Sequence, residues 1–279
     1  MPTSFRRIAH PTDLAQDSEF AFYHALRLAV AARSHLDVLH VDKAAHATRW
    51  GDYPGVGQTL TKWGFPADAL QRNGDGDRLR AIAAYGTEPV HPIIEYLDEA
   101  LPDLMVLATH RRHGLDRWLH KEIAQKLARS RAVSTLFVPY GDEGFVSPSQ
   151  GTVLLRQVVI PVDWIPVAQA AVDAVADLGT VLGCPGLTVT LLHVSEKTED
   201  FPPLEPPERE GWTWKRQTRS GAVVDEVLAV AEDVGADLVA MVTQGHDGFL
   251  DALRGSTTER VLQRVRCPLL AVPSLDAGL

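Results

Sequence analysis

The sequence predicts an α/β protein of two Rossmann-like, doubly wound domains, each built on a mainly five-stranded parallel sheet. Short apolar runs of strand length alternate with segments of helical periodicity, and this order occurs twice along the chain. Residues 103–139 also align with residues 237–273 without a gap, at a constant offset of 134, so that Asp103 meets Asp237. An ungapped repeat of this length indicates internal duplication.

The first predicted domain covers residues 1–140. Strands are predicted at residues 5–10, 36–41 and 79–85, before the strand, loop, helix and strand of the repeat. A helix is predicted over residues 19–33, with Asp17 and Ser18 as capping candidates. Residues 42–77 have little periodicity and predict a long, partly helical excursion. Another helix carries apolar residues at helical spacing, from Val90 to Leu97.

The second predicted domain covers residues 152–279, after a Gly- and Ser-containing linker at residues 141–151. Its strands are expected at residues 156–161, 187–194, 213–220, 237–242 and 269–272. Helices are expected over residues 167–182, from Gly221 onward, and after Gly255, and residues 196–212 are predicted to form an acidic, proline-rich loop.

Composition narrows the function classes. The 279 residues carry a formal net charge of −9, which argues weakly against nucleic acid as a partner. Cys184 and Cys267 form no metal-binding pattern and suit free thiols in a reducing compartment. No signal-peptide pattern and no apolar run of about 18 residues occurs, so no membrane contact is expected and the expected location is the cytoplasm.

An anion site is predicted in the second domain, where a strand leads into a glycine loop and a helix start. The strand at residues 237–242 is followed by a Gly-containing turn at residues 243–248, and Gly255, Ser256 and Thr257 open the next helix. Backbone N–H groups converge at such a junction, which favours an anion.

The order of these motifs resembles the universal stress protein (UspA) superfamily in its tandem form. Both first strands end in a Pro-x-Asp motif, at residues 11–13 and 161–163, and both second strands end in Leu-His-Val, closing at Val41 and Val194. The resemblance covers nearly the whole chain. It implies that the last strands of the two domains, residues 136–138 and 269–272, pair as an intramolecular pseudo-dimer.

Many members of that superfamily bind ATP through G-x2-G-x9-G-[ST], and the second domain matches this motif in part. Gly245, nine residues and then Gly255-Ser256 fit, whereas Val242 occupies the first glycine position and could narrow or block the pocket. The resemblance places Asp163 and Val194 at the adenosine end. The full expected cofactor site is Pro161, Val162, Asp163, Val194, Val242, Gly245, Gly255, Ser256 and Thr257.

The first domain has lost the motif. Ala108, Arg111, Lys121 and Glu122 occupy its four key positions. Glu122 puts a negative charge where a phosphate would lie, so no ATP is expected there. The basic residues could attract another anion, although a solvated basic surface is the favoured interpretation.

Other constellations point to packing rather than chemistry. The loop histidines His110, His113 and His120 are candidates for a metal site, with His10 and His40 as further candidates. A metal site is disfavoured, because no cysteine or carboxylate stands at ligand spacing beside them. Asp13 and Asp163 suit caps or ribose contacts better than acid–base roles. No Gly-x-Ser-x-Gly or other nucleophile motif occurs.

The sequence therefore predicts a cytoplasmic, non-enzymatic stress-response module that binds ATP or another adenine nucleotide in the second domain only, without a metal. Three alternatives stay open: a protein that binds no nucleotide and acts through contacts with an unknown protein partner, one that binds another small ligand, and a weak ATPase. A further homodimer of the whole chain is also open.

Overall fold

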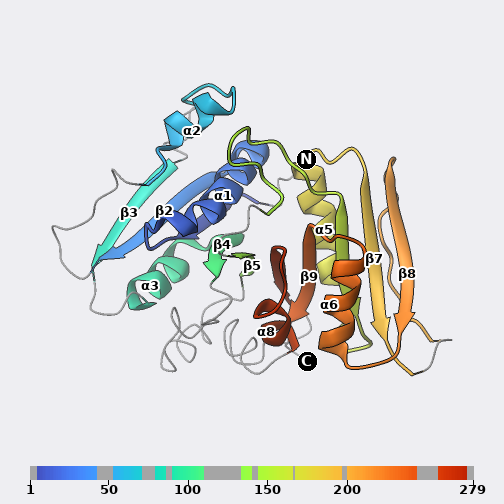
Figure 1. Cartoon of the computed structure of the whole chain (residues 1–279). Helices are drawn as coiled ribbons and strands as arrows, with labels where there is room; N and C mark the ends of the chain where they lie inside the picture. The colour runs from blue at the N-terminus through green and yellow to red at the C-terminus, as the bar shows by residue number, and fades with distance from the viewer. Residues whose placement is uncertain are drawn as a thin grey trace.

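In the part of the chain that the structure describes, one ten-stranded sheet joins the two halves (Figure 1). The computed structural model describes residues 5–42, 53–70, 79–85, 90–109, 133–139, 144–165, 167–196, 200–243 and 257–274. Along the sheet the strand order is β3-β2-β1-β4-β5-β10-β9-β6-β7-β8, with β3 and β8 at the two edges. In the sheet, the strands of the first half therefore lie on one side, from β3 to β5. Those of the second half lie on the other side, from β10 to β8.

The elements follow the predicted order, with ends within a few residues of the predicted ones. In the first half they are β1 (Arg7–Pro11), η1 (Gln16–Ser18), α1 (Glu19–Ala32), β2 (His35–Asp42), α2 (Val56–Lys62), β3 (Leu79–Tyr85), α3 (Val90–Ala100), β4 (Leu104–Thr109) and β5 (Ser134–Pro139). In the second half they are β6 (Gln157–Val162), α5 (Gln169–Val181), β7 (Leu187–Val194), β8 (Trp212–Arg219), α6 (Val223–Asp233), β9 (Leu238–Thr243), α8 (Thr257–Leu262) and β10 (Leu269–Pro273). The helix predicted between β4 and β5 lies outside the described residues.

The two halves join through their last strands, as predicted. Within each half all neighbouring strands are parallel, but β5 and β10 pair antiparallel, with Leu136 opposite Leu270 and Phe137 opposite Leu269. Each half thus closes the open edge of the other, which confirms the intramolecular pseudo-dimer and the doubly wound fold.

The aligned aspartates of the repeat have the same structural role. Asp103 accepts hydrogen bonds from the backbone N–H groups of Arg6 and Arg7, at 2.8 and 2.9 Å. Asp237 accepts the matching pair from residues 156 and 157, at 2.7 and 2.8 Å. Each carboxylate therefore fixes the amino end of the first strand of its half against the fourth.

Apolar side chains cover both faces of the sheet. One cluster lies against α1 and α5 and contains Phe22, Leu26 and Val172, all buried. The other lies against α3, α6 and α8 and contains Leu97 and Val227. Burial on both faces explains why most of the parallel strands are near-continuous apolar runs.

The predicted linker is less open than its composition suggests. Its described part begins at Gly144, and Phe145 is fully buried, with its N–H donating to Nε2 of His24 at 3.1 Å. At the other end the carbonyl of Gly151 accepts from Nε of Arg27 at 2.9 Å. Glycine, serine and proline occur in tight turns as well as in loose linkers, and here they form turns fixed to α1.

The predicted capping role of Ser18 is wrong. Ser18 has φ −83° and ψ −6° and makes no side-chain cap bond, because the 3-10 turn η1 precedes α1 directly. A capping side chain needs an extended backbone at this position. Its hydroxyl instead donates to the carbonyl of Ala15 at 2.7 Å, while Oδ1 of Asp13 accepts from the Ala15 N–H at 3.0 Å.

Candidate functional site

A pocket of about 370 Å³ opens at the carboxyl ends of β6, β7 and β9. The strands β6 and β9 pair only at Val158 with Leu238 and at Val159 with Val239, and beyond these residues they separate. From β6 the sheet continues through β7 on one side, whereas β9 and β10 lie on the other. This is the topological switch point, where parallel sheets bind ligands.

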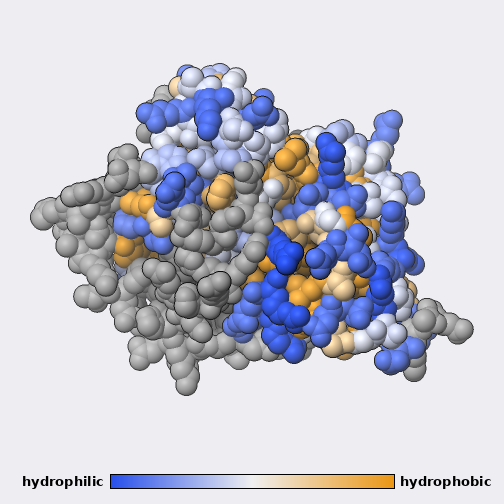
Figure 2. Space-filling model, viewed as in Figure 1, coloured by the Kyte–Doolittle hydropathy of each residue, from blue (hydrophilic) through white to orange (hydrophobic). Residues whose placement is uncertain are grey.

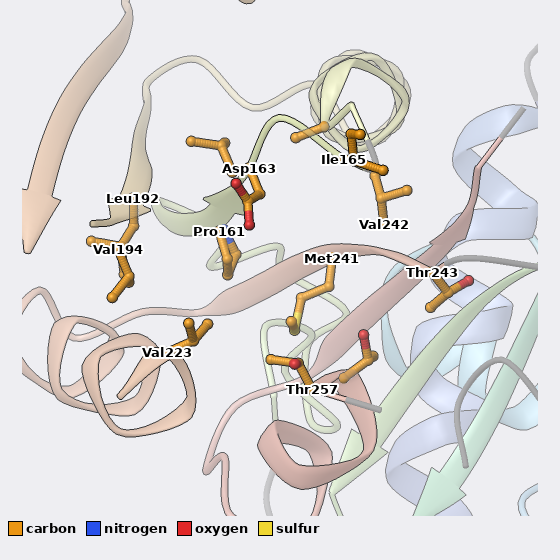
Figure 3. Close-up of a pocket in the computed structure, with 13 residues that line it drawn as sticks. Pro161, Asp163, Ile165, Leu192, Val194, Val223, Met241, Val242, Thr243 and Thr257 are labelled. Atoms are coloured by element: carbon orange, nitrogen blue, oxygen red, sulfur yellow. The ribbon is translucent and has the colours of Figure 1, made fainter. Parts of the chain in front are cut away.

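The pocket has a mostly apolar lining with four polar residues. Its walls are Pro161, Val162, Asp163, Ile165, Ala168, Leu192, Val194, Val223, Met241, Val242, Thr243, Thr257 and Thr258. Figure 3 shows Asp163 and Thr257 on opposite sides of the space, with Met241 between them at the β9 side. Such a lining suits a ligand with an apolar body and a few hydrogen-bonding groups.

The structure brings six of the nine predicted site residues to this one pocket. These are Pro161, Val162, Asp163, Val194, Val242 and Thr257. The other three, Gly245, Gly255 and Ser256, lie outside the described residues. Residues from β6, β7, β9 and α8, far apart in the sequence, therefore meet at one pocket.

Asp163 and the threonines supply the polar contacts of the pocket. Asp163 is exposed, and its Oδ1 accepts from the N–H of Trp164 at 2.8 Å, so the carboxylate keeps further acceptor positions. Thr243 and Thr258 are buried, at 3% exposure each. Among the described lining residues there is no histidine, cysteine or lysine, so the described walls offer contacts for binding and no obvious general base besides the carboxylate.

Val242 contributes a β-branched side chain to the wall. It is half-buried, packs against the cluster under α5 and lies near Ile165 (Figure 3). Val242 thus lines the pocket, and its restriction of the pocket stays a prediction.

Sequence reasoning missed seven lining residues: Ile165, Ala168, Leu192, Val223, Met241, Thr243 and Thr258. Leu192 could have been found, because it lies two residues before Val194 and shares its side of the strand. Met241 and Thr243 flank Val242 at a strand end, which is where ligands bind. Ile165 and Val223 gave no such signal.

Exposed apolar side chains at the pocket and next to it in the sequence form an apolar rim. Trp164, Ile165, Val167 and Val223 are between 42% and 78% exposed, although large apolar side chains are usually more buried. In the space-filling view, apolar residues gather over the second half and are bordered by hydrophilic ones (Figure 2). The rim is thus available to a ligand or to another molecule.

Comparison with known proteins identifies the family. Residues 4–139 and 204–273 match the model of the universal stress protein family. The chain belongs to that family. A solved universal stress protein from Archaeoglobus fulgidus is 17% identical, with a TM-score of 0.62 over 99% of this chain and 98% of that chain. A second structure, from Pseudomonas aeruginosa, is 15% identical, with a TM-score of 0.64 over 99% of this chain and 95% of that one.

A curated universal stress protein of Methanocaldococcus jannaschii is 38% identical over 65 residues, or 23% of this chain. The chain spans 38% of the length of that relative. These likenesses establish family and fold. They leave the ligand to be argued from the pocket itself.

In the first half of this universal stress protein, β1 and β4 correspond to β6 and β9, and side chains fill the space where these two strands separate. Here β1 and β4 also pair at only two positions, Ile8 with Leu104 and Ala9 with Met105. Just beyond them the ring of His10 donates from Nδ1 to the carbonyl of Val106 at 2.9 Å. Its Nε2 accepts from the hydroxyl of Tyr53 at 2.7 Å.

His10 is therefore a core histidine rather than a metal ligand. Burial lowers its pKa to about 4, which keeps the ring neutral and fixes its donor and acceptor sides. His40 bonds the carbonyl of Thr12 at 2.9 Å, and His193 makes the equivalent bond to Val162 at 3.0 Å. The histidine of each Leu-His-Val motif thus holds the end of the first strand of its half.

Within the described residues no group of three or more potential metal ligands occurs, and no helix has the length and apolarity to span a membrane.

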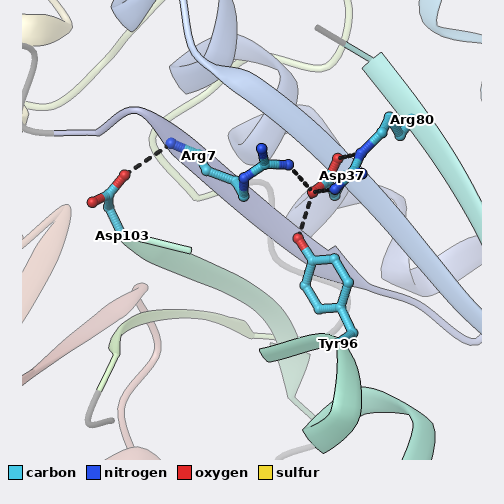
Figure 4. Close-up of polar contacts among 5 residues, drawn as sticks. All are labelled: Arg7, Asp37, Arg80, Tyr96 and Asp103. Atoms are coloured by element: carbon cyan, nitrogen blue, oxygen red, sulfur yellow. Dashed lines mark hydrogen bonds and ion pairs between the residues drawn. The ribbon is translucent and has the colours of Figure 1, made fainter. Parts of the chain in front are cut away.

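A second polar cluster, centred on Asp37, lies at the amino ends of β1, β2 and β3 (Figure 4). Asp37 is fully buried and accepts from Arg7, Arg80 and Tyr96, at distances between 2.6 and 2.8 Å. Burial alone would raise the pKa of Asp37, but these hydrogen bonds lower it below its usual value. Because its members satisfy one another, the cluster is structural. In the second half Thr190 occupies the same register position.

Proposed function

We propose that the protein is a ligand-responsive binding module of the stress response, and that the second half binds an adenine nucleotide. The observation that carries this proposal is the meeting of Pro161, Asp163, Val194, Val242 and Thr257 in one pocket at the switch point of the sheet. The resemblance to universal stress proteins assigns the same residues to a nucleotide site.

The residues of the site suit both the adenosine part and the phosphate part of such a ligand. The apolar walls formed by Leu192, Val194 and Met241 suit a base, which is planar and largely apolar on its faces. Asp163 can accept hydrogen bonds from ribose hydroxyls, as acidic residues do in related folds. Gly255 and Ser256 follow the family motif for phosphates.

The proposal confines the nucleotide to the second half and assigns binding rather than turnover. In the first half Arg111, Lys121 and Glu122 replace the residues that would contact phosphates. Asp163 is the one acidic residue among the described lining residues. The proposal gives its carboxylate a contact with the ligand and no role as a general base.

Calorimetric titration with ATP tests the proposal. Gly255→Glu places a carboxylate at the phosphate position and is expected to abolish binding. Lys121→Gly is the matched control in the first half and is expected to leave binding unchanged. Two equivalent sites per chain, or binding that survives Gly255→Glu, would overturn the assignment.

A second candidate function is contact with a protein partner through the apolar rim. The exposure of Trp164, Ile165 and Val167 favours it, because exposed apolar side chains that lie together often mark a contact with another protein. Ile165→Asp is expected to abolish a cross-link formed in cells from a photo-reactive group at Val167. If the cross-link forms equally well in Ile165→Asp, and also with or without added nucleotide, this candidate is rejected.

A further inference from the structure

A polar hollow of about 420 Å³ lies beside β6, β7 and β8, toward the amino ends of β6 and β7. The residues that line this polar hollow are Gln157, Thr188, Thr190, Lys215, Arg216, Gln217 and Val234. The described residues that line the pocket at the carboxyl ends of the strands form a different set. The polar hollow is therefore separate from the nucleotide pocket.

Two residues at the centre of the polar hollow face the same side of the sheet. Thr190 on β7 is paired with Lys215 on β8. Side chains of a strand alternate between its faces, and Leu192, two residues after Thr190, packs in the cluster under α6. Trp214 packs against the cluster on the opposite face, so its neighbour Lys215 also lies on the α6 side.

The polar hollow occupies the position that the Asp37 cluster has in the first half. Asp37 is paired with Arg80 across β2 and β3, as Thr190 is paired with Lys215 across β7 and β8. The pairing of these strands with β1 and β6 shows that Asp37 and Thr190 have the same register. Thr190 is thus the equivalent of Asp37, and Lys215 is the equivalent of Arg80.

The correspondence extends to the residues around this pair. Gln157 stands where Arg7 stands, at the start of the first strand of its half. Val234 follows Ala100 by 134 residues, the offset of the repeat. Arg7 and Ala100 line a groove beside Asp37, and their equivalents line the polar hollow. The two halves therefore shape the same place with different side chains.

The main chemical difference between the two places is a carboxylate. In the first half Asp37 supplies it and accepts from Arg80 at 2.6 and 2.7 Å. In the second half Thr190 has only a neutral hydroxyl. Neither Thr190 nor Lys215 makes a side-chain hydrogen bond or ion pair to any residue that the structure describes.

The carboxylates closest along the chain to this place have other partners. Asp233, at the end of α6, forms an ion pair with Arg219 at 3.0 Å. Asp237 accepts from the backbone N–H groups of residues 156 and 157. The ammonium group of Lys215 therefore stays available to an anion from outside the chain.

We infer that the polar hollow binds the carboxylate of a small organic acid, which takes the place that Asp37 has in the first half. Lys215 provides the positive charge, and the hydroxyl of Thr190 and the amide of Gln157 provide further hydrogen-bond donors. Asp37 shows that this place in the fold accommodates a carboxylate. The inference does not depend on the proposed function, because the two sites are separate.

The test is NMR titration of the full chain with butyrate and with butyramide, its uncharged counterpart of similar shape. The backbone amide signals of Thr190 and Lys215 are expected to shift. Butyrate is expected to bind about tenfold more tightly than butyramide, the effect of a hydrogen bond to a charged group. Raising the salt concentration should weaken butyrate binding and leave butyramide binding nearly unchanged.

Variants locate the effect. Lys215→Ala is expected to remove the tenfold preference for butyrate. Thr190→Asp gives the second half its own carboxylate and should prevent butyrate from binding. Arg216→Ala is the matched control, because it removes the same charge from the next residue, whose guanidinium lies over the ring of Phe201 at 5.2 Å. If Thr190→Asp does not fold, Lys215→Ala still decides, because Lys215 is exposed.

Two other anions test the class of ligand. Inorganic phosphate that binds more tightly than butyrate would overturn the assignment to a carboxylate. A short peptide with one glutamate, capped at both ends, tests an acidic side chain as the source of the carboxylate. Tighter binding of this peptide than of butyrate would overturn the assignment to a small acid.

The outcomes separate this inference from the proposed function. If butyrate has no advantage over butyramide, or keeps its advantage in Lys215→Ala, the carboxylate site is refuted. Calorimetry with ATP should give the same result for Lys215→Ala as for the natural chain. The nucleotide site therefore stands or fails on its own titration.

Discussion

Removing the carboxylate of Asp37 is expected to destabilise the first half strongly. In Asp37→Ala, two guanidinium groups and a tyrosine hydroxyl lose their common acceptor (Figure 4). Removing one partner of a buried ion pair costs about 3–5 kcal/mol. The side chains of Arg7 and Arg80 are 26% and 47% exposed and can turn to water, so we expect the lower end, about 3 kcal/mol.

Two other variants give losses of unfolding free energy against which the loss in Asp37→Ala can be compared. Arg80→Ala should cost less, about 1 kcal/mol, because the arginine is half-exposed and Asp37 keeps Arg7 and Tyr96. Thr190→Ala alters the equivalent position of the second half and should cost about 1 kcal/mol as well. The measurement is urea unfolding followed by circular dichroism.

The effect of Asp37→Ala should also depend on pH. The pKa of Asp37 is below its usual value in the folded chain, so the carboxylate contributes stability above the unfolded pKa of about 4. That contribution is lost as the pH falls through the folded pKa, and the difference between the natural chain and the variant should shrink there. A cost below 1 kcal/mol at neutral pH, or one no larger than that of Arg80→Ala, would refute this account of the cluster.

Three further predictions concern the sheet, the pocket and a buried histidine. Residues 152–279 expressed alone should dimerise through the uncovered edge of β10, and a monomer at high concentration in analytical ultracentrifugation would contradict this. Val242→Gly should tighten nucleotide binding about ten- to a hundredfold in calorimetry, because overlap with a stiff side chain is removed. An unchanged affinity would show that Val242 does not restrict the pocket. Burial lowers the pKa of His24 to about 4, so the unfolded chain takes up a proton first and stability should fall by about 3 kcal/mol between pH 6.5 and 4. The same urea series on His24→Gln should lose much of this slope, and an equal slope would contradict the assignment.

The sequence predicted strands best where an apolar run has clear ends. The strands β3 and β7 have the predicted bounds, and the family resemblance predicted the pairing of β5 with β10. The resemblance to universal stress proteins assigned Pro161, Asp163 and Val194 to the nucleotide site, and all three lie at or next to the ends of β6 and β7, where ligands of parallel sheets bind. These features depend on local pattern or on topology, and both can be inferred without coordinates.

The remaining features depend on contacts between distant segments. Asp37 meets its partners 30, 43 and 59 residues away, and no local signal indicates a buried ionic cluster. Val223 reaches the pocket because α6 packs against the sheet beside it. Composition likewise could not show that Phe145, inside the predicted linker, is buried against His24.

Native mass spectrometry of the intact chain tests the central claim, a nucleotide site in the second half alone, most directly. With excess adenine nucleotide, the account predicts one bound molecule per chain, and none for Gly255→Glu. Two bound molecules would mean that the first half also binds nucleotide, and a chain that stays empty would contradict the proposed function.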